Sequence, residues 1–373
     1  MDFAGITDHI LFPWLFSILA GIYFGVLLGV LVGLLRLRQP NASITPYISV
    51  VIAARNEADR ITACLQSLTK LDYPQDRYEV IMVDDHSSDA TPQLIQQYCS
   101  RYPNWKFIAL NQKSRELKGK KQALLTGIAA AQGEIIFTTD ADCVVPPGWL
   151  QYMSRYFERD VTMVLGYSPL IEQKGFCQGL LAFDNLFSAI VAAAPTQLGH
   201  PISSVGRNLA YRKDAYNDVG SFLALKKFRS GDDVYLTERF RYLNVGKIVF
   251  CAHPQTFVAT LPPASGKEIF HSQLRKHSKI FKQTPSSIAI SLGVFLSYCW
   301  LTLFPFFAPQ YLTPWLYTMA IKFLLEFIDL TVAARIFRQT HQVKYFPIMQ
   351  IIYPFYIFFF SFLGAFERYR WKE

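Results

Sequence analysis

Acidic side chains follow three apolar segments of this chain, each at the point where the segment ends. Asp84 and Asp85 follow one segment, Asp140 and Asp142 follow a second, and Glu57 lies just after a third. An Asp-x-Asp pair on a turn offers two hard oxygen ligands, which suit Mg²⁺ or Mn²⁺. A cation held in this way usually completes its coordination with substrate phosphates. The residues therefore predict chemistry on a phosphorylated substrate.

The segments around these acids alternate between strand-like and helix-like patterns. Short β-branched runs predict strands at 47–53, 78–83, 105–110 and 134–139. Apolar residues at helical spacing predict helices at 58–70, 90–101, 120–131 and 234–242. This alternation predicts an open parallel α/β sheet with helices on both faces, which binds ligands at the carboxyl ends of its strands. The acids should therefore share one edge, although no Gly-rich dinucleotide or Walker loop follows a strand.

The same acids have purely structural alternatives. Asp140 and Asp142 could simply form a turn, and Asp89 could cap the helix that follows it. Asp233, at the start of another expected helix, could act only through the helix dipole. Three polar clusters at one sheet edge are less expected by chance than any single one, which favours a binding site.

The composition indicates a globular domain combined with membrane segments. Of the 373 residues, 51% are hydrophobic and 17% are charged, whereas a soluble domain carries about 25% charged residues. The net charge of +9 is consistent with anionic lipid or an anionic substrate. No basic block of five or six residues occurs, so we expect no nucleic-acid partner. The six cysteines lack paired spacing and are expected to be reduced thiols.

Four apolar segments are candidates to cross a bilayer. They comprise residues 10–35, 286–307, 312–334 and 346–366, and about 20 apolar residues suffice for a span. Arg36 and Arg38 after the first segment place the next domain in the cytosol. We therefore expect an anchor and linker at 1–46, a cytosolic domain at 47–282 and a membrane region of two or three spans at 283–373. This organisation predicts a multi-pass protein of the bacterial plasma membrane, with cleavage of the first segment as a signal peptide as the alternative.

Two segments are ambiguous. Residues 312–334 carry Lys322, Glu326 and Asp329, of which the first two could pair on one helical face. Whether this segment spans decides the side of the C-terminal tail, 367–373, and the sequence leaves both possibilities open. Residues 175–194 are apolar but interrupted, so they could form either an interfacial helix or a core helix.

Six motifs, in this order, resemble the family 2 glycosyltransferases, whose nucleotide-sugar domain has the GT-A fold. They are VVIAARNEADRI (50–61), VDDHSSDAT (83–91), GKKQAL (119–124), TTDADCVVPPGW (138–149), GRNLAYRKDAYNDVGSF (206–222) and GDDVYLTER (231–239). The resemblance covers roughly residues 47–282. It implies a Rossmann-like GT-A domain flanked by N-terminal and C-terminal transmembrane helices.

The resemblance implies a role for each matching residue. The nucleotide would be contacted by Ala53, Arg55, Glu57, Asp85, Lys120 and Asp140, with Asp85 on the base and Asp140 on the ribose. Asp142 would bind a divalent metal, Mg²⁺ or Mn²⁺, on the diphosphate, and Asp233 would be the general base. The donor and acceptor cleft would be lined by Gly206, Arg207, Asn208, Asp232, Gln273, Arg275 and Lys276.

These residue types fit glycosyl transfer. A metal stabilises the leaving diphosphate, and a carboxylate on the opposite face deprotonates the acceptor hydroxyl. This arrangement implies direct displacement with inversion at the anomeric carbon. A covalent glycosyl-enzyme would need a second carboxylate near the sugar, and the sequence offers no obvious candidate.

One motif departs from the pattern of processive family members. They carry Gln-x-x-Arg-Trp after the base, whereas the stretch here contains Gln273, Arg275 and Lys276 without the Trp. The missing indole argues against polymer synthesis. The basic residues could either close over the diphosphate or contact lipid headgroups.

We therefore expect inverting, metal-dependent transfer of one sugar from a nucleotide-sugar, with UDP-sugars favoured, to a membrane lipid. A processive polysaccharide synthase, or a subunit of one, is the alternative. A catalytically inactive nucleotide-binding scaffold is disfavoured by the acidic set, and a lipid transporter by the small membrane region.

Overall fold

A computed structural model describes residues 12–37, 39–40, 44–112, 114, 116–117, 120–228, 231–279, 285–364 and 366. The chain forms two compact units, Leu37–Glu268 and the combination of Met1–Arg36 with Ile269–Glu373. The expected roles of 1–46, 47–282 and 283–373 as anchor, catalytic domain and membrane region remain predictions. The C-terminal tail, 367–373, lies outside the described residues.

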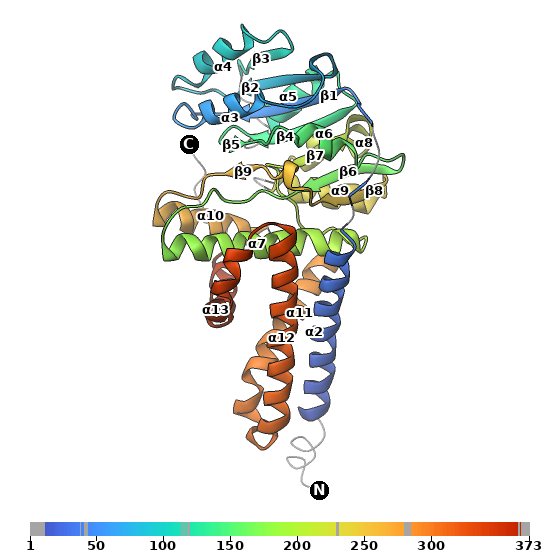
Figure 1. Ribbon diagram of the computed structural model, residues 1–373, viewed down its shortest axis with the longest axis vertical. Helices are drawn as coiled ribbons and strands as arrows, with labels where there is room; N and C mark the ends of the chain where they lie inside the picture. The colour runs from blue at the N-terminus through green and yellow to red at the C-terminus, as the bar shows by residue number, and fades with distance from the viewer. Residues whose placement is uncertain are drawn as a thin grey trace. The chain divides into compact units, whose positions relative to one another are not determined.

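The unit Leu37–Glu268 is built on a seven-stranded sheet with the order β3-β2-β1-β4-β7-β6-β8 (Figure 1). Its strands are β1 (Ile48–Ala54), β2 (Tyr78–Asp84), β3 (Trp105–Ala109), β4 (Ile135–Asp140), β6 (Val161–Gly166), β7 (Leu209–Arg212) and β8 (Lys247–Cys251). The strands β3, β2, β1 and β4 are parallel, as the sequence predicts.

The expected parallel arrangement holds for these four strands, whereas β7, which the sequence does not predict, runs antiparallel to both β4 and β6. The connection between β6 and β7 passes through helix α7 (Phe176–Gln197). Because β7 runs opposite to β6, this connection begins and ends at the same edge of the sheet. Residues just before β7 therefore lie at the edge where β4 ends with Asp140.

Helices cover both faces of this sheet. Val50 and Ile52 of β1 share one core with Ile61 and Leu65 of α3 (Ile61–Leu68). Because successive residues of a strand point to opposite faces of the sheet, Val51 points to the other face. On the other face, α5 (Lys121–Ala130) packs through Gly127. A Cβ at Gly127 would lie 2.5 Å from Cγ1 of Val51, so only glycine permits this close approach. The helices α4 (Thr91–Cys99), α6 (Trp149–Ser154) and α8 (Lys213–Asp218) also belong to this unit.

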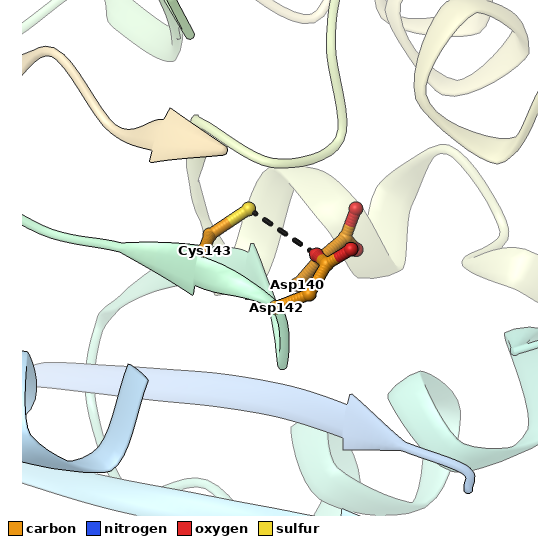
Figure 2. A group of neighbouring side chains, drawn as sticks. All are labelled: Asp140, Asp142 and Cys143. Carbon is orange, nitrogen blue, oxygen red and sulfur yellow. Dashed lines mark hydrogen bonds between the residues drawn. The ribbon is translucent and has the colours of Figure 1, made fainter. Parts of the chain in front are cut away.

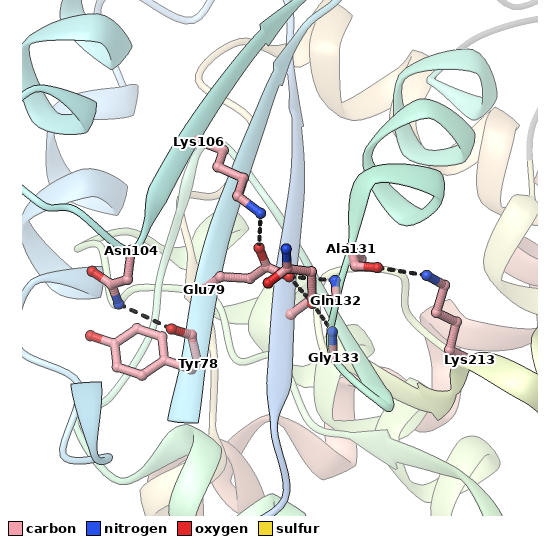
Figure 3. Close-up of polar contacts among 9 residues, drawn as sticks. Tyr78, Glu79, Asn104, Lys106, Ala131, Gln132, Gly133 and Lys213 are labelled. Carbon is pink, nitrogen blue, oxygen red and sulfur yellow. Dashed lines mark hydrogen bonds and ion pairs between the residues drawn. The ribbon is translucent and has the colours of Figure 1, made fainter. Parts of the chain in front are cut away.

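A buried carboxylate joins the strands at the edge opposite the acidic clusters (Figure 3). Glu79, only 2% exposed, accepts hydrogen bonds from Ser49 Oγ, Gln132 N and Lys106 Nζ, each at 2.6 Å. Burial alone would raise the pKa of Glu79, but these three donors lower it below its usual value. The network therefore fastens β1, β2, β3 and the loop before β4 together.

The second unit is mainly helical. Its long helices are α2 (Phe12–Leu35), α11 (Pro285–Phe307), α12 (Leu312–Ile336) and α13 (Phe346–Gly364). By length and hydropathy, Pro13–Leu35 and Thr340–Gly364 could each cross a membrane. Leu292–Phe307 and Pro309–Ile336 meet this criterion as a pair that bends by 106°. The expected apolar segments at both ends of the chain are therefore confirmed as helices that could span.

A polar cluster lies inside this helical unit. Lys322 Nζ is 2.8 Å from Glu326 Oε1, which confirms the pair expected from their spacing. The same ammonium donates to Gln350 Oε1 of α13 at 3.1 Å. Tyr23 of α2 donates its hydroxyl to Glu326 Oε1 at 2.5 Å. The N-terminal helix is thus tied to the C-terminal helices by hydrogen bonds as well as by packing.

The ambiguous segment 175–194 forms α7, one side of which is buried in the unit Leu37–Glu268. Asn185 donates to the carbonyl oxygen of Ser168 at 3.2 Å, and Gln197 donates to that of Phe250 in β8 at 3.2 Å. Although α7 is long and apolar enough to cross a membrane, these contacts hold it against the sheet-containing unit.

Candidate active site

Two carboxylates stand together where β4 ends. Asp140 is the last residue of β4, and Asp142 directly precedes β5 (Cys143–Val144). Ligand atoms of Asp140, Asp142 and Cys143 all lie within 4.8 Å of one another, and Figure 2 shows the two carboxylates side by side. This spacing allows one small cation to contact both acids.

Cys143 supports this pair as a hydrogen-bond donor. Its Sγ lies 3.6 Å from Asp142 Oδ1 (Figure 2). Burial, reinforced by the charges of Asp140 and Asp142, raises the pKa of the thiol, while the charge of Arg207 opposes the rise. A protonated thiol is a poor partner for a hard cation, so the two carboxylates are the donors that fit Mg²⁺ or Mn²⁺.

A third carboxylate belongs to another element. Asp233 lies in the first turn of α9 (Asp232–Leu243), and its Oδ2 accepts the backbone N–H of Gly206 at 2.8 Å. Gly206 is placed by β4, because Thr138 Oγ1 lies 3.3 Å from its carbonyl oxygen. The side chain of Asp233 is thus held by a residue outside its own helix, in addition to any effect of the helix dipole.

Lys120 connects the two acidic sites. Its Nζ forms an ion pair with Asp140 Oδ1 at 2.6 Å, and it lies 3.6 Å from the position that a Cβ on Gly206 would occupy. Burial would lower the pKa of Lys120, but the charges of Asp140, Asp232 and Asp233 outweigh it and raise that pKa. Lys120 therefore stays charged between the β4 acids and Asp233.

The expected nucleoside contacts follow β1 and β2 at the same edge. Ala53 is in register with Asp140, and Ala54 is in register with Asp84, so Asp84 and Asp140 stand two strand spacings, about 10 Å, apart. Asp85 donates its backbone N–H to the carbonyl oxygen of Ala54 at 2.8 Å.

The turn after β2 is held by side chains. Asp85 Oδ1 lies 3.0 Å from His86 Nδ1, and His86 has a φ of 59°. Asp89 accepts the backbone N–H groups of Thr91 and Ala58, each at 3.0 Å. Asp89 thus binds the N–H of the first residue of α4, although the N-cap position itself is occupied by Ala90. The same carboxylate also binds the loop after β1, where Glu57 donates its N–H to Thr91 Oγ1 at 2.9 Å.

Several buried polar atoms at this edge have no hydrogen-bond partner among the described residues. They are Arg55 Nε, Asp84 Oδ1, His86 Nε2, Thr139 Oγ1 and Arg207 Nε. Buried polar groups in folded proteins are normally paired. Their concentration around the ends of β1, β2 and β4 is what a site for a polar ligand requires.

Two residues expected to line the cleft are instead engaged inside the protein. The side chain of Asn208 is completely buried, and its amide accepts from Trp149 Nε1 and donates to the carbonyl oxygens of Tyr167 and Thr256. Asp232 is 7% exposed and pairs with Lys121 at 2.8 Å. These contacts fit supporting roles better than direct contact with a substrate.

Gln273, Arg275 and Lys276 lie on α10 (Gly266–Ser278). From Ile269 onward this helix belongs to the helical unit. Their expected role in the cleft remains a prediction.

Sequence reasoning assigned no role to Lys121 or Cys143. Lys121 lies in the motif at 119–124 and Cys143 in the motif at 138–149, but nothing in the sequence distinguishes a fully buried lysine from an exposed one.

Comparisons with known proteins agree with this geometry. Residues 49–219 match the family model described as Glycosyl transferase family 2. Glycosyltransferase AglE of Haloferax volcanii is 31% identical over 204 residues, which cover 53% of this chain and 62% of that protein. Beta-monoglucosyldiacylglycerol synthase of Synechocystis sp. is 39% identical over 119 residues, which cover 31% of this chain and 24% of that protein. The chain thus matches less than two thirds of the length of either relative.

One solved structure resembles nearly the whole chain. Mannosyltransferase PcManGT from Pyrobaculum calidifontis, in complex with GDP-Man and Mn²⁺, superposes with a TM-score of 0.56 at 17% identity. The superposition covers 95% of this chain and 96% of that protein. This likeness confirms the GT-A fold expected from the sequence.

Proposed function

We propose, on the premise that the chain carries a glycosyl transferase family 2 domain at residues 49–219, that it transfers one sugar from a nucleotide-sugar to a lipid hydroxyl. The transfer is metal-dependent and inverts the anomeric carbon. The processive alternative receives no support from a particular contact in the structure, and the sequence lacks the Trp of the processive motif.

The observation that carries the proposal is the arrangement around Lys120. Its ammonium is 2.6 Å from Asp140 and lies beside Gly206, whose N–H binds Asp233 at 2.8 Å. An acidic pair for a cation, a lysine for a phosphate and a separate carboxylate for a proton are therefore neighbours at one sheet edge. In transfer of a sugar from a diphosphate to an alcohol, such groups stabilise the charge of the leaving group and accept the proton of the alcohol.

The residue expected to hold the metal is Asp142, and the neighbouring Asp140, expected on the ribose, has donor oxygens close enough to contact the same hard divalent cation. Such a cation, when bound, offsets the negative charge of the leaving diphosphate. Lys120 places a further positive charge beside the same acids. The nucleoside contacts proposed for Ala53, Arg55, Glu57 and Asp85 lie after the neighbouring strands β1 and β2.

In the chemical step, Asp233 removes the proton of the acceptor hydroxyl. The hydroxyl oxygen attacks the anomeric carbon while the bond from that carbon to the diphosphate oxygen breaks, and the bonding electrons leave with the diphosphate. Attack from the face opposite the leaving group inverts the anomeric configuration. Donation from the Gly206 N–H fixes one oxygen of Asp233 during this step.

A membrane lipid is the acceptor that best fits the rest of the chain. The helices α2, α11, α12 and α13 supply the apolar segments that could hold the protein in a bilayer. The Synechocystis relative is named as a synthase of a glycosylated diacylglycerol, which supports a lipid hydroxyl here. We propose a UDP-sugar as donor, whereas the Pyrobaculum protein binds GDP-Man, so both nucleotides need testing.

The test offers the purified full chain a panel of UDP- and GDP-sugars with Mn²⁺ and total membrane lipid, and weighs the products by mass spectrometry. The proposal predicts a lipid heavier by one sugar unit, formed with one donor and lost with EDTA. A ladder of products with many sugar units would instead support the processive alternative. If no donor is consumed and no lipid gains mass, the proposed activity is wrong.

A further inference from the structure

Lys121 is completely buried and connects two points that flank the start of α9. Its Nζ donates to the carbonyl oxygen of Phe228 at 2.7 Å and to Asp232 Oδ1 at 2.8 Å. Phe228 lies before the first turn of α9, and its ring also stacks on Tyr235 of that helix at 3.9 Å between centroids. One ammonium therefore clamps both the chain that leads into α9 and the first residue of α9.

The residue after Asp232 is Asp233, the proposed base. Because the ion pair with Lys121 fixes Asp232, it also restricts the positions that the side chain of Asp233 can adopt. At the other end of the clamp, Lys121 follows Lys120 in the sequence, and the two ammonium groups bind different acids, Asp232 and Asp140. The start of α5 is thus fastened to both the end of β4 and the start of α9.

We propose that Lys121 is a positioning residue that sets the place of Asp233 relative to the acids of β4. It touches neither the sugar nor the nucleotide, and it acts through Asp232 and the carbonyl group of Phe228. This inference rests on the proposed role of Asp233 as base. It also assigns Asp232, expected from the sequence to line the cleft, to the same support.

A buried ion pair could equally serve stability alone, so the test needs a comparison pair. Glu79 and Lys106 provide it, because they also form a lysine–carboxylate pair at 2.6 Å in the same unit, but at the opposite edge of the sheet. In the comparison pair the carboxylate is buried, whereas the lysine is 42% exposed. If such lysine–carboxylate pairs matter only for folding, disrupting either pair should have the same kinds of effect.

The variants separate position from stability. K121M leaves Asp232 buried without its cation, and loss of one partner of a buried pair is strongly destabilising. K121M/D232L replaces both partners by apolar residues, which often restores stability but leaves the Phe228 carbonyl group without its donor. D232N keeps an oxygen that can accept from Lys121. The comparison variant is E79Q/K106M.

The main readout is hydrogen exchange of the Gly206 amide, because Asp233 accepts that N–H and no enzymatic turnover is needed. We expect exchange about tenfold faster in K121M and K121M/D232L, the effect of losing one hydrogen bond. D232N and E79Q/K106M should exchange like the original chain. Unchanged Gly206 exchange in K121M/D232L overturns the proposal, even if K121M itself fails to fold.

Kinetics give the second readout. In K121M/D232L we expect kcat to fall about tenfold or more, while the Kd for the nucleoside diphosphate (UDP or GDP) in the presence of Mn²⁺ changes by less than about threefold. D232N should keep most of kcat. A large loss of kcat in D232N would indicate that Asp232 contacts the substrate directly, and this result would overturn the proposal. If the unmodified chain transfers no sugar, the proposed function fails, but the exchange of Gly206 still tests the clamp.

Discussion

The N–H of Gly206 binds Oδ2 of Asp233 at 2.8 Å, although the two residues belong to different elements. A Cβ at position 206 would lie 3.4 Å from Cβ of Asp233 and 3.6 Å from Nζ of Lys120. These are ordinary contact distances, so a methyl group fits, but a larger side chain would enter the space between the lysine and the carboxylate.

This relationship predicts a graded response at position 206. Gly206→Ala should keep most of the transfer activity, whereas Gly206→Val should lower kcat by about tenfold or more, because displacement of the base disrupts the near-attack geometry. Steady-state rates with saturating donor provide the measurement. Equal activity of both variants would show that the space beside Asp233 is not used.

Asp142 should be required for the effect of the metal. We expect Asp142→Ala to weaken Mn²⁺-dependent nucleotide binding and to lower transfer by about a hundredfold or more, since charge stabilisation of the leaving group is lost. Calorimetric titration of UDP and GDP, with and without Mn²⁺, measures the binding. Asp160→Ala is the control, because Asp160 is an exposed acid of the same unit.

The Glu79 network predicts how stability depends on pH. The pKa of Glu79 is lowered in the folded state, so its stabilising effect is complete above the unfolded-state pKa of about 4.3 and is lost as the pH falls through the lower, folded-state value. Glu79→Gln should cost about 2–4 kcal/mol near neutral pH.

Urea unfolding of the two proteins between neutral and acidic pH measures both effects. The difference in unfolding free energy between the original chain and Glu79→Gln should shrink as the pH falls below about 4. A difference that stays constant over this range would mean that the charge of Glu79 does not contribute.

The hydroxyl of Tyr23 should stabilise the helical unit modestly. Tyr23→Phe removes one hydrogen bond to Glu326, and hydrogen bonds between membrane helices contribute about 0.6 kcal/mol on average and up to about 1.7. Thermal unfolding in detergent should show a small decrease in midpoint. Tyr317→Phe, at an exposed position of α12, should show none.

Local patterns were sufficient to predict the first half of the sheet. Short apolar runs predicted β1, β2, β3 and β4 to within one residue. The signal is clear in β1, β2 and β4 because these strands are almost completely buried. The direction of β7 was not predictable in this way. That direction depends on the edge of the sheet to which α7 returns the chain, and no local pattern in Leu209–Arg212 indicates this edge.

The candidate site shows the same division. The acids at strand ends could be found because the carboxyl edge of a parallel sheet gathers them. The burial of Asn208 and Lys121 could not be predicted. A polar residue whose hydrogen-bond partners all lie inside the protein cannot be distinguished, in the sequence, from any other polar residue. Contacts between distant segments decide these roles, as with Trp149 and Asn208.

Asp233→Asn is the sharpest test of Asp233 as the base, because it keeps the size of the side chain and an oxygen for the Gly206 N–H while removing the proton acceptor. We expect this variant to bind the donor nucleotide and Mn²⁺ with unchanged Kd but to transfer sugar in a single turnover at least about a hundredfold more slowly. Transfer at the original rate with intact binding would contradict the assignment of Asp233 as the base.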